Sequence, residues 1–208
     1  MEDKKIFIIG GSHTTAFTGK ANEINDFNKI YIKNNFISYR TFPYTCFNIE
    51  NKLEIIKNII VDLNINKNSR LFIIYGETDI RHHIGFHSTD SNLEENIKKI
   101  VLNYINFLNK IKKIHNNLGV FAPIASGPYN GLSGTEHKSY KNSFERNKIT
   151  KLFNNELKKQ CYDNNIIFKT LFDKLIDENG NTINDYFDIC GIHLNPDKVE
   201  YLLKELFT

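Results

Sequence analysis

Residues 6–17 read IFIIGGSHTTAF, and this stretch decides how the chain is expected to fold. Its apolar start is rich in β-branched isoleucine and runs directly into Gly10, Gly11 and Ser12. A short apolar run that stops on glycine is typical of a strand buried within a sheet. The stretch therefore predicts a first strand that ends on glycine and a turn that presents the hydroxyl group of Ser12.

Strands and helices alternate along the rest of the chain. Further strands are predicted at residues 28–33, 69–77, 118–126 and 166–171, and helices at 51–65, 91–115, 145–164 and 195–207. Repeated strand–helix units imply a mainly parallel sheet with helices on both faces, here a three-layer α/β/α sandwich of roughly five strands. No internal repeat or linker interrupts the pattern, so residues 1–208 are expected to form a single domain.

Local signals mark the ends of several elements. Ser91 and Glu94 have the spacing of a capping box, and Asn195 is placed to cap a last helix that begins at Pro196. Residues 126–134, SGPYNGLSG, are rich in glycine and are expected to form a loop. Apolar spacing predicts one buried face on the helix at 91–115, formed by Leu93, Ile97, Ile100, Tyr104, Leu108 and Ile111.

The composition indicates neither a nucleic-acid-binding protein nor a membrane protein. Of 208 residues, 27 are Lys or Arg and 24 are Asp or Glu, so the net charge is only +3, and nucleic acid is not an expected partner. No segment resembles a signal peptide or a membrane span, so we expect no membrane association and a cytoplasmic location. Cys46, Cys161 and Cys190 are far apart and are expected to be free thiols whose spacing indicates no zinc site.

Ser12 is predicted to lie beyond the carboxyl end of the first strand, which is where ligands bind in parallel sheets. A serine at such a turn is next to unpaired backbone N–H groups that can stabilise an oxyanion. Two other interpretations of this segment stay open. Ser12 can cap the following helix, or the loop can cradle a phosphate, although it lacks the lysine and spacing of a nucleotide-binding loop.

A nucleophilic serine needs a general base, and His193 is the candidate. It lies just before the last helix, in the stretch DYFDICGIHLNP at residues 185–196, between Gly191 and the predicted cap Asn195. A histidine in such a loop is placed to face a site and not a core. The alternative interpretation is a loop histidine that faces solvent.

The densest polar cluster of the chain is GETDIRHHIGFH, at residues 76–87, where the strand at 69–77 ends. The residues of this cluster that we expect to hold substrate or an oxyanion are Glu77, Thr78, Asp79, Arg81 and His82. Arg81 can instead pair with Glu77 or Asp79 to stiffen the loop. His83, His87 and Asp79 form an alternative metal site, which the glycine between the two histidines disfavours.

These three segments, in this order along nearly the whole chain, resemble the sequence blocks of the SGNH, or GDSL-like, hydrolases. GGSH with Ser12 matches the block that carries the nucleophile, GETD matches a Gly-x-Asn-Asp block, and CGIHLN with His193 matches an Asp-x-x-His block. GETDIR is also similar to a subgroup whose third block reads Gly-Glu-Ile-Asp-x-Arg. The resemblance implies the flavodoxin-like three-layer fold of that family.

The chain departs from the family pattern at three positions. Cys190 stands where the family has the aspartate that orients the histidine, Thr78 replaces the oxyanion-hole asparagine, and Phe42 replaces the glycine of the second block. Asp188 and Asp185 are near enough in sequence to substitute for the acid. Cys190 is interpreted as a packing residue that fills the acid's space.

The resemblance implies a serine esterase or acyltransferase that acts on a small O-acetyl-type group of a carbohydrate. In this hypothesis Ser12 is the nucleophile, His193 the general base and Asp188 the acid, while Gly11 and Thr78 help to hold the oxyanion. The expected partner is a glycan or a small molecule, and neither a cofactor nor a metal is expected. The competing hypothesis is a carbohydrate-binding protein that has the same fold and no catalytic activity.

Overall fold

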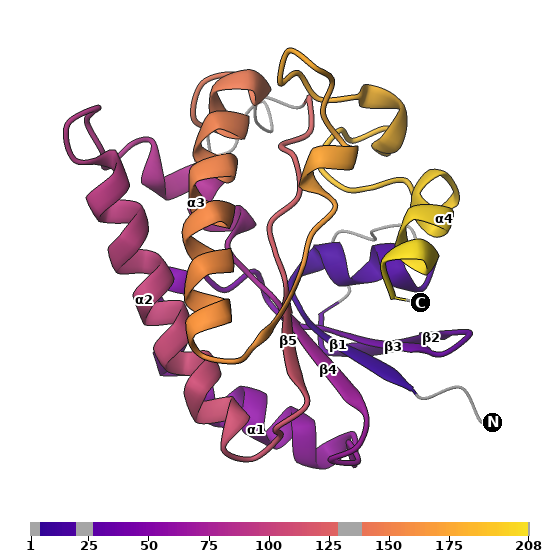
Figure 1. The fold of residues 1–208 in the computed structure, drawn as a ribbon. Helices are drawn as coiled ribbons and strands as arrows, with labels where there is room; N and C mark the ends of the chain where they lie inside the picture. Colours follow the sequence, from indigo (N-terminus) through magenta and orange to yellow (C-terminus); the bar gives the residue numbers. More distant parts are fainter. Residues whose placement is uncertain (1–4, 20–26, 129–138, 208) are drawn as a thin grey trace.

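The structure, a computed structural model, describes residues 5–19, 27–128 and 139–207 (Figure 1). Most of the loop predicted at residues 126–134 lies outside the described residues. Within them, the strands are β1 (Ile6–Gly10), β2 (Lys29–Lys33), β3 (Phe36–Arg40), β4 (Arg70–Ile74), β5 (Leu118–Phe121) and β6 (Ile167–Lys169). These six strands form one sheet in the order β2-β3-β1-β4-β5-β6.

The sheet is parallel except for β2 and β3, which form an antiparallel hairpin at one edge. The sequence predicted roughly five strands and missed β3, which pairs with β1. In β3 the buried positions hold Phe36, Ser38 and Arg40. Two of these are polar, so the alternation of apolar residues that marks a strand is not visible in the sequence.

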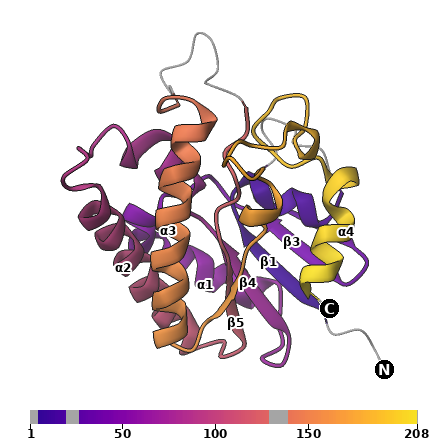
Figure 2. The ribbon, with the colours of Figure 1, turned by 45° about the horizontal axis from the view of Figure 1, so that its top comes forward.

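Helices cover both faces of the sheet, which confirms the three-layer fold (Figures 1 and 2). The helices are α1 (Leu53–Asp62), α2 (Leu93–Lys112), α3 (Ser143–Asp163), α4 (Pro196–Phe207) and the short 3₁₀-helix η1 (Ser12–Phe17). Phe7 and Ile9 of β1 pack in one core cluster with α1, α2 and α3. Ile6 and Ile8 point the other way and pack with η1 and α4, as expected for a strand between two layers.

Two predicted helix caps have different outcomes. The capping box at Ser91 is wrong, because α2 begins at Leu93 and the Ser91 hydroxyl instead lies 2.9 Å from the hydroxyl of Thr89. The cap at Asn195 is confirmed, since its Oδ1 accepts a hydrogen bond from the Asp197 N–H at 3.1 Å and α4 begins at Pro196. His193 lies two residues before this cap and three before the first residue of α4.

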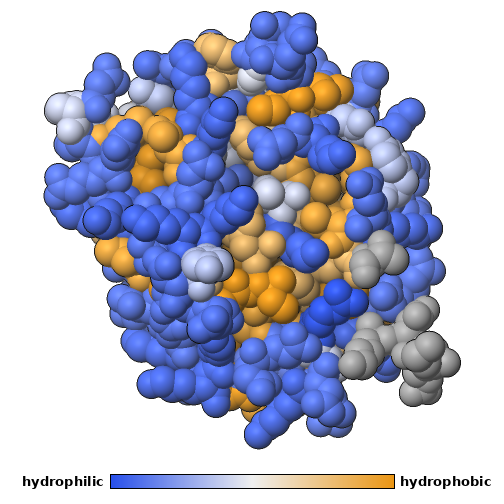
Figure 3. All heavy atoms as spheres, viewed as in Figure 1, coloured by the Kyte–Doolittle hydropathy of each residue, from blue (hydrophilic) through white to orange (hydrophobic). Residues whose placement is uncertain are grey.

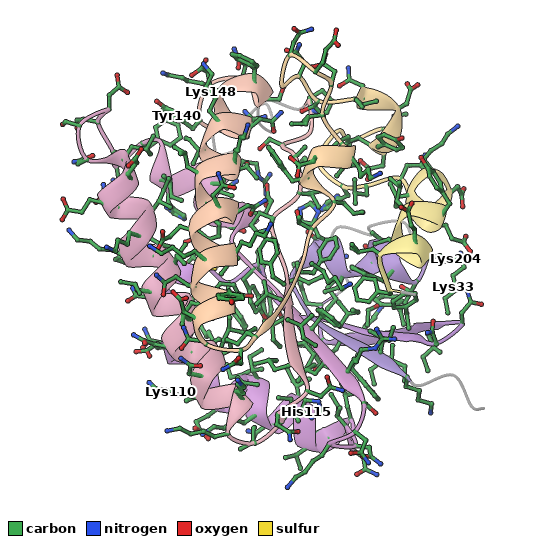
Figure 4. All side chains as sticks on the ribbon, in the orientation of Figure 1. Lys33, Lys110, His115, Tyr140, Lys148 and Lys204 are labelled. Atoms are coloured by element: carbon green, nitrogen blue, oxygen red, sulfur yellow. The ribbon has the colours of Figure 1, made fainter. Side chains whose placement is uncertain are left out.

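The chain leaves β1 and β4 toward opposite faces of the sheet. β1 leads into η1, which packs with α4, whereas β4 leads toward α2 on the other face. Neighbouring strands whose connections diverge in this way open a crevice at their carboxyl ends, which is the usual ligand site of such sheets. His115 lies at the opposite end of the molecule, where its Nε2 is 2.9 Å from the Ser69 carbonyl oxygen (Figure 4).

Hydrophilic residues cover most of the face seen in Figure 3, and hydrophobic residues gather between α3 and α4. Among the described residues, no helix combines the length and the apolar composition needed to cross a bilayer.

Candidate active site

Ser12 follows directly on a close contact between β1 and β4. A Cβ atom on Gly10 would collide with the Ile74 carbonyl oxygen, so glycine is needed there for the two strands to pair. Gly11 precedes η1, and Ser12 is the first residue of that helix. The interpretation of Ser12 as a helix cap is wrong, because its side chain does not cap η1. Its hydroxyl oxygen instead lies 2.8 Å from Nε2 of His193.

His193 is presented by a tight loop between two paired residues, Phe187 and Leu194. The Asp188 N–H donates to the His193 carbonyl oxygen at 2.8 Å, and the Gly191 N–H donates to the Asp188 carbonyl oxygen at 2.9 Å. Gly191 has a φ of +66°, a left-handed conformation that glycine adopts without strain. The His193 side chain is 15% exposed, so the histidine faces the site and not bulk solvent.

The far side of the imidazole faces two groups. Nδ1 of His193 is 3.6 Å from Oδ2 of Asp188 and 3.4 Å from Sγ of Cys190. The Cys190 thiol donates to Oδ1 of Asp188 at 2.8 Å. Asp188, the acid predicted to substitute, therefore lies at the ring, whereas the side chain of Cys190 is exposed and the interpretation of Cys190 as a packing residue is wrong.

Burial favours a neutral imidazole at His193, although a carboxylate lies beside the ring. Burial lowers the pKa of His193 below its ordinary value, and the neighbouring Asp188 opposes this effect only in part. Burial alone would raise the pKa of Asp188, but hydrogen bonds with His193 and Cys190 outweigh it and lower the pKa. At neutral pH the ring is therefore free to accept a proton from Ser12.

A second row of polar side chains leads away from the ring through His13, which the sequence analysis missed. The His13 and His193 rings are 5.1 Å apart, and Nε2 of His13 is 3.7 Å from Oε2 of Glu77. Arg81 contacts both oxygens of Glu77, at 2.7 and 3.2 Å, which confirms the predicted Glu77–Arg81 pair. Although burial acts in the other direction, Arg81 and His13 hold the pKa of the Glu77 carboxyl well below its usual range.

A small cavity opens beside Ser12 and His13. It is lined by residues from the turns after β1, β3 and β4: Gly11, Ser12, His13, Pro43, Tyr44, Ile74, Tyr75, Glu77, Thr78 and Arg81. The structure thus brings Gly11, Glu77, Thr78 and Arg81 to the serine. His82 is half-buried on the neighbouring π-helical turn η3 (Asp79–Ile84) and is not among the lining residues.

Asp79 was expected to hold substrate, but it is not among the residues that line this cavity. Its carboxylate is fully buried and accepts hydrogen bonds from the N–H groups of Cys46 at 2.7 Å and Phe47 at 3.1 Å. These are the first N–H groups of the 3₁₀-helix η2 (Cys46–Lys52), which leads into α1. Burial raises the pKa of Asp79 to about 6, and the two N–H groups limit the rise.

The alternative metal site is not assembled, because His83 and His87 lie apart from the inward-facing Asp79. Their rings are parallel at 6.3 Å and line a larger cavity with Phe47 and Ile84. Across the described part of the chain, the one group of three metal-ligating side chains that converges is Asp188, Cys190 and His193, whose donor atoms lie within 4.8 Å of one another.

Arg146 of α3 is a further residue that the sequence analysis missed, because it sits on a helix with no recognisable motif. It is 1% exposed and donates to the carbonyl oxygens of Gly127 at 3.0 Å and Tyr140 at 3.1 Å (Tyr140 is labelled in Figure 4). Burial lowers its pKa to about 10. Arg146 lines a second small cavity with Glu77 and Arg81, two residues that also line the cavity beside Ser12.

No protein-family model matches the sequence, and no curated protein matches it. A protein from Bacteroides fragilis assigned as an acylhydrolase is 18% identical with a TM-score of 0.59, over 98% of this chain and 84% of that one. A GDSL-like lipase from Bacteroides thetaiotaomicron is 17% identical with a TM-score of 0.56, over 97% and 86%. A catalytic mutant of an acetylxylan esterase from Geobacillus stearothermophilus is 10% identical with a TM-score of 0.52, over 100% and 94%. The chain therefore has the fold of GDSL-like lipases and acylhydrolases.

Proposed function

We propose that this protein is a serine esterase or acyltransferase that acts on a small O-acetyl-type group of a carbohydrate. The observation that carries the proposal is the 2.8 Å separation of Ser12 Oγ and His193 Nε2, with Asp188 beyond the ring. A nucleophile, a base and an orienting acid in line are the arrangement that activates a serine hydroxyl. The fold shared with an acetylxylan esterase, whose catalytic mutants replace a serine and an aspartate, supports the choice of reaction.

In the first half of the reaction, Ser12 Oγ attacks the ester carbonyl carbon while its proton moves to His193 Nε2. The C–O bond to the sugar then breaks, and Nε2 returns the proton to the leaving hydroxyl group. Asp188 stabilises the transient imidazolium and keeps the remaining proton on Nδ1. The product of this half-reaction is an acetyl ester on Ser12.

The second half-reaction decides between hydrolysis and transfer. A water molecule or an acceptor hydroxyl group gives its proton to Nε2 and attacks the acyl carbon, and the Ser12 Oγ leaves and regains the proton. The same residues serve both outcomes, so the acceptor that reaches the cavity determines which product forms.

The backbone N–H of Ser12 and a donor from Thr78 are the groups that we assign to the oxyanion. Gly11, Ser12 and Thr78 line one cavity, so their donors surround the space where the carbonyl oxygen would lie. The small size of this cavity and its tyrosine walls, Tyr44 and Tyr75, favour a short acyl group. Arg81 is held by Glu77 at the same wall, where its remaining N–H groups are placed to orient a polar sugar.

A fluorophosphonate probe tests the proposal, because it reacts with activated serine hydroxyl groups. With a chelator present, the protein should be labelled at Ser12 and should hydrolyse acetyl esters faster than long-chain esters. Ser12→Ala should remove labelling, and Ser12→Ala and His193→Ala should each lower the acetyl-esterase rate by about 10³-fold or more. Mass spectrometry locates the label, and acetylated oligosaccharides test the carbohydrate substrate.

Ser91→Ala and His87→Ala are the matched controls, because both residues are exposed and lie outside the cavity beside Ser12. Both variants should be labelled and active like the parent protein. If the parent protein is neither labelled nor active, and still binds acetylated oligosaccharides, the competing hypothesis of a non-catalytic binding protein replaces this one.

A further inference from the structure

We propose that the loop Asp188–His193 also forms a zinc site, and that zinc bound there switches off the Ser12–His193 pair. The three ligands are a carboxylate oxygen of Asp188, the thiolate of Cys190 and Nδ1 of His193, which converge within 4.8 Å. Zinc is the cation that such a set of sulfur, imidazole nitrogen and carboxylate oxygen suits, whereas magnesium and calcium require oxygen ligands.

The separations between the donor atoms fit a tetrahedral ion. Zinc bonds of about 2.0–2.3 Å place neighbouring ligand atoms roughly 3.3–3.6 Å apart. Nδ1 of His193 is 3.4 Å from Cys190 Sγ and 3.6 Å from Asp188 Oδ2. The Cys190 Sγ to Asp188 Oδ1 distance is shorter, at 2.8 Å, because the thiol proton joins these two atoms. Loss of that proton on metal binding removes the bond and lets the sulfur and oxygen separate.

The loop holds the three ligands in place before any ion binds. Backbone hydrogen bonds join Asp188 to His193 and Gly191 to Asp188, so the Asp-x-Cys-x-x-His spacing is folded into one turn. Cys190 is exposed, which leaves a path from solvent to the fourth coordination position. The cysteine at the position of the family's acid thus adds a soft ligand to a pair that would otherwise have only oxygen and nitrogen.

The effect on catalysis follows from the two nitrogens of one ring and rests on the proposed function. A neutral imidazole carries one proton, and zinc on Nδ1 forces that proton onto Nε2. Nε2 then donates to Ser12 and is unable to accept the serine proton. Per ion bound, the Cys190 thiol releases one proton to solvent, and no electron is transferred.

Cobalt(II) in place of zinc tests the site without any assay of activity. Titration of the metal-free protein should give the visible absorption of tetrahedral cobalt and a thiolate-to-cobalt charge-transfer band, both of which added zinc removes. Cys190→Ser should abolish the charge-transfer band and weaken zinc binding by at least about 100-fold. The matched control His83→Gln/His87→Gln removes the exposed histidine pair and should leave the spectrum unchanged.

Acetyl-ester hydrolysis then tests the switch. Saturating zinc should lower the rate by about 10³–10⁴-fold, as expected when the imidazole is held in the wrong tautomer, and a chelator should restore it. Magnesium should have no effect, and Cys190→Ser, measured against its own metal-free rate, should need correspondingly more zinc. Absence of the charge-transfer band in the parent protein would refute the site. Zinc binding at Cys190 without inhibition of an active enzyme would refute the switch, and a protein inactive without metal would refute the proposed function alone.

Discussion

At the scale of single residues, the acid of the candidate triad comes from an unusual position. Asp188 lies five residues before His193 and not three, yet the turn at Gly191 brings its carboxylate to 3.6 Å from Nδ1. The Cys190 thiol donates a hydrogen bond to the same carboxylate and lies 3.4 Å from Nδ1. The loop thus places two side chains beside Nδ1, where the GDSL-like pattern that the sequence resembles has one aspartate.

The pH dependence of the proposed reaction tests this arrangement. In chelator, kcat/KM should rise with pH through a midpoint below 6.5, because burial lowers the pKa of His193 more than Asp188 raises it. Asp188→Asn removes the carboxylate that favours the imidazolium, so the midpoint should move to lower pH and the plateau should fall by up to about 10⁴-fold. The other ionisable neighbours of the ring, His13, Glu77 and Cys190, are present in both proteins.

A compensating substitution is the control for the Asp188→Asn profile. Cys190→Asp in the Asp188→Asn background places a carboxylate where Sγ is now 3.4 Å from Nδ1. This second change should raise the midpoint again and recover at least about tenfold in rate. A midpoint that is the same in all three proteins would show that Asp188 does not act on His193.

At the scale of elements, the turn after β4 divides its polar residues between two tasks. Glu77 and Thr78 face the cavity beside Ser12, whereas the next residue, Asp79, points into the protein and binds the N–H groups that begin η2. The N–H groups at the start of a helix have no partner within the helix. Here the Asp79 carboxylate accepts the hydrogen bonds of these N–H groups. It thereby joins the turn after β4 to η2, the helix that leads into α1.

Asp79→Ala should lower the free energy of unfolding by about 1–3 kcal/mol, because it leaves buried N–H groups without an acceptor. The pKa of Asp79 is raised to about 6 in the folded state, above its value in the unfolded chain. The contribution of Asp79 to the free energy of unfolding is therefore largest below about pH 4 and decreases as the pH rises through 6. Urea denaturation of the parent protein and of Asp79→Ala, below about pH 4 and above about pH 6, measures this difference. Asp90→Ala, at an exposed position, should change little, and equal costs for the two variants would argue against the cap.

At the scale of the whole molecule, an aromatic cluster packs α4 against η1 and the sheet. Phe207 of α4 packs against Phe17 of η1, Phe36 of β3 and Phe72 of β4, with ring centroids 5.7, 5.5 and 4.9 Å apart. On the surface, Glu200 accepts hydrogen bonds from Lys33 and Lys204, which lie together in Figure 4. Exposed ion pairs contribute little, so the aromatic packing dominates the docking of α4.

Phe207→Ala should lower the free energy of unfolding by about 3–5 kcal/mol, because it opens a cavity among these rings. The same change loosens the contact between α4 and η1, so fluorophosphonate labelling of Ser12 should slow in the fraction of protein that stays folded. Leu206→Ala, at a partly buried position, is the neighbouring control and should cost less. If both variants unfold at the same urea concentration, the cluster is not what holds α4 in place.

Much of the fold was predictable because its signals are local. The apolar run that ends at Gly10 and the three-to-four spacing in α2 depend only on neighbours in the chain, and both elements form as expected. The missed strand β3 shows the limit of this reasoning, because Ser38 is buried and its hydroxyl group lies 3.3 Å from that of Thr18, 20 residues away in the sequence. From the sequence alone a polar residue is expected to be exposed, because its burial depends on a hydrogen-bond partner that the sequence does not identify.

The sequence by itself determined the order of the strands and helices apart from β3, and it selected Ser12 and His193, because periodicity and motif spacing belong to short segments. Only the tertiary structure decided that these two side chains meet, that Asp188 reaches the ring, that His13 lies beside it and that Asp79 turns away. Each of these facts depends on the packing of segments that are distant in the chain or on the course of one turn. Such contacts are set by the shape of the whole core, which no short stretch of sequence contains.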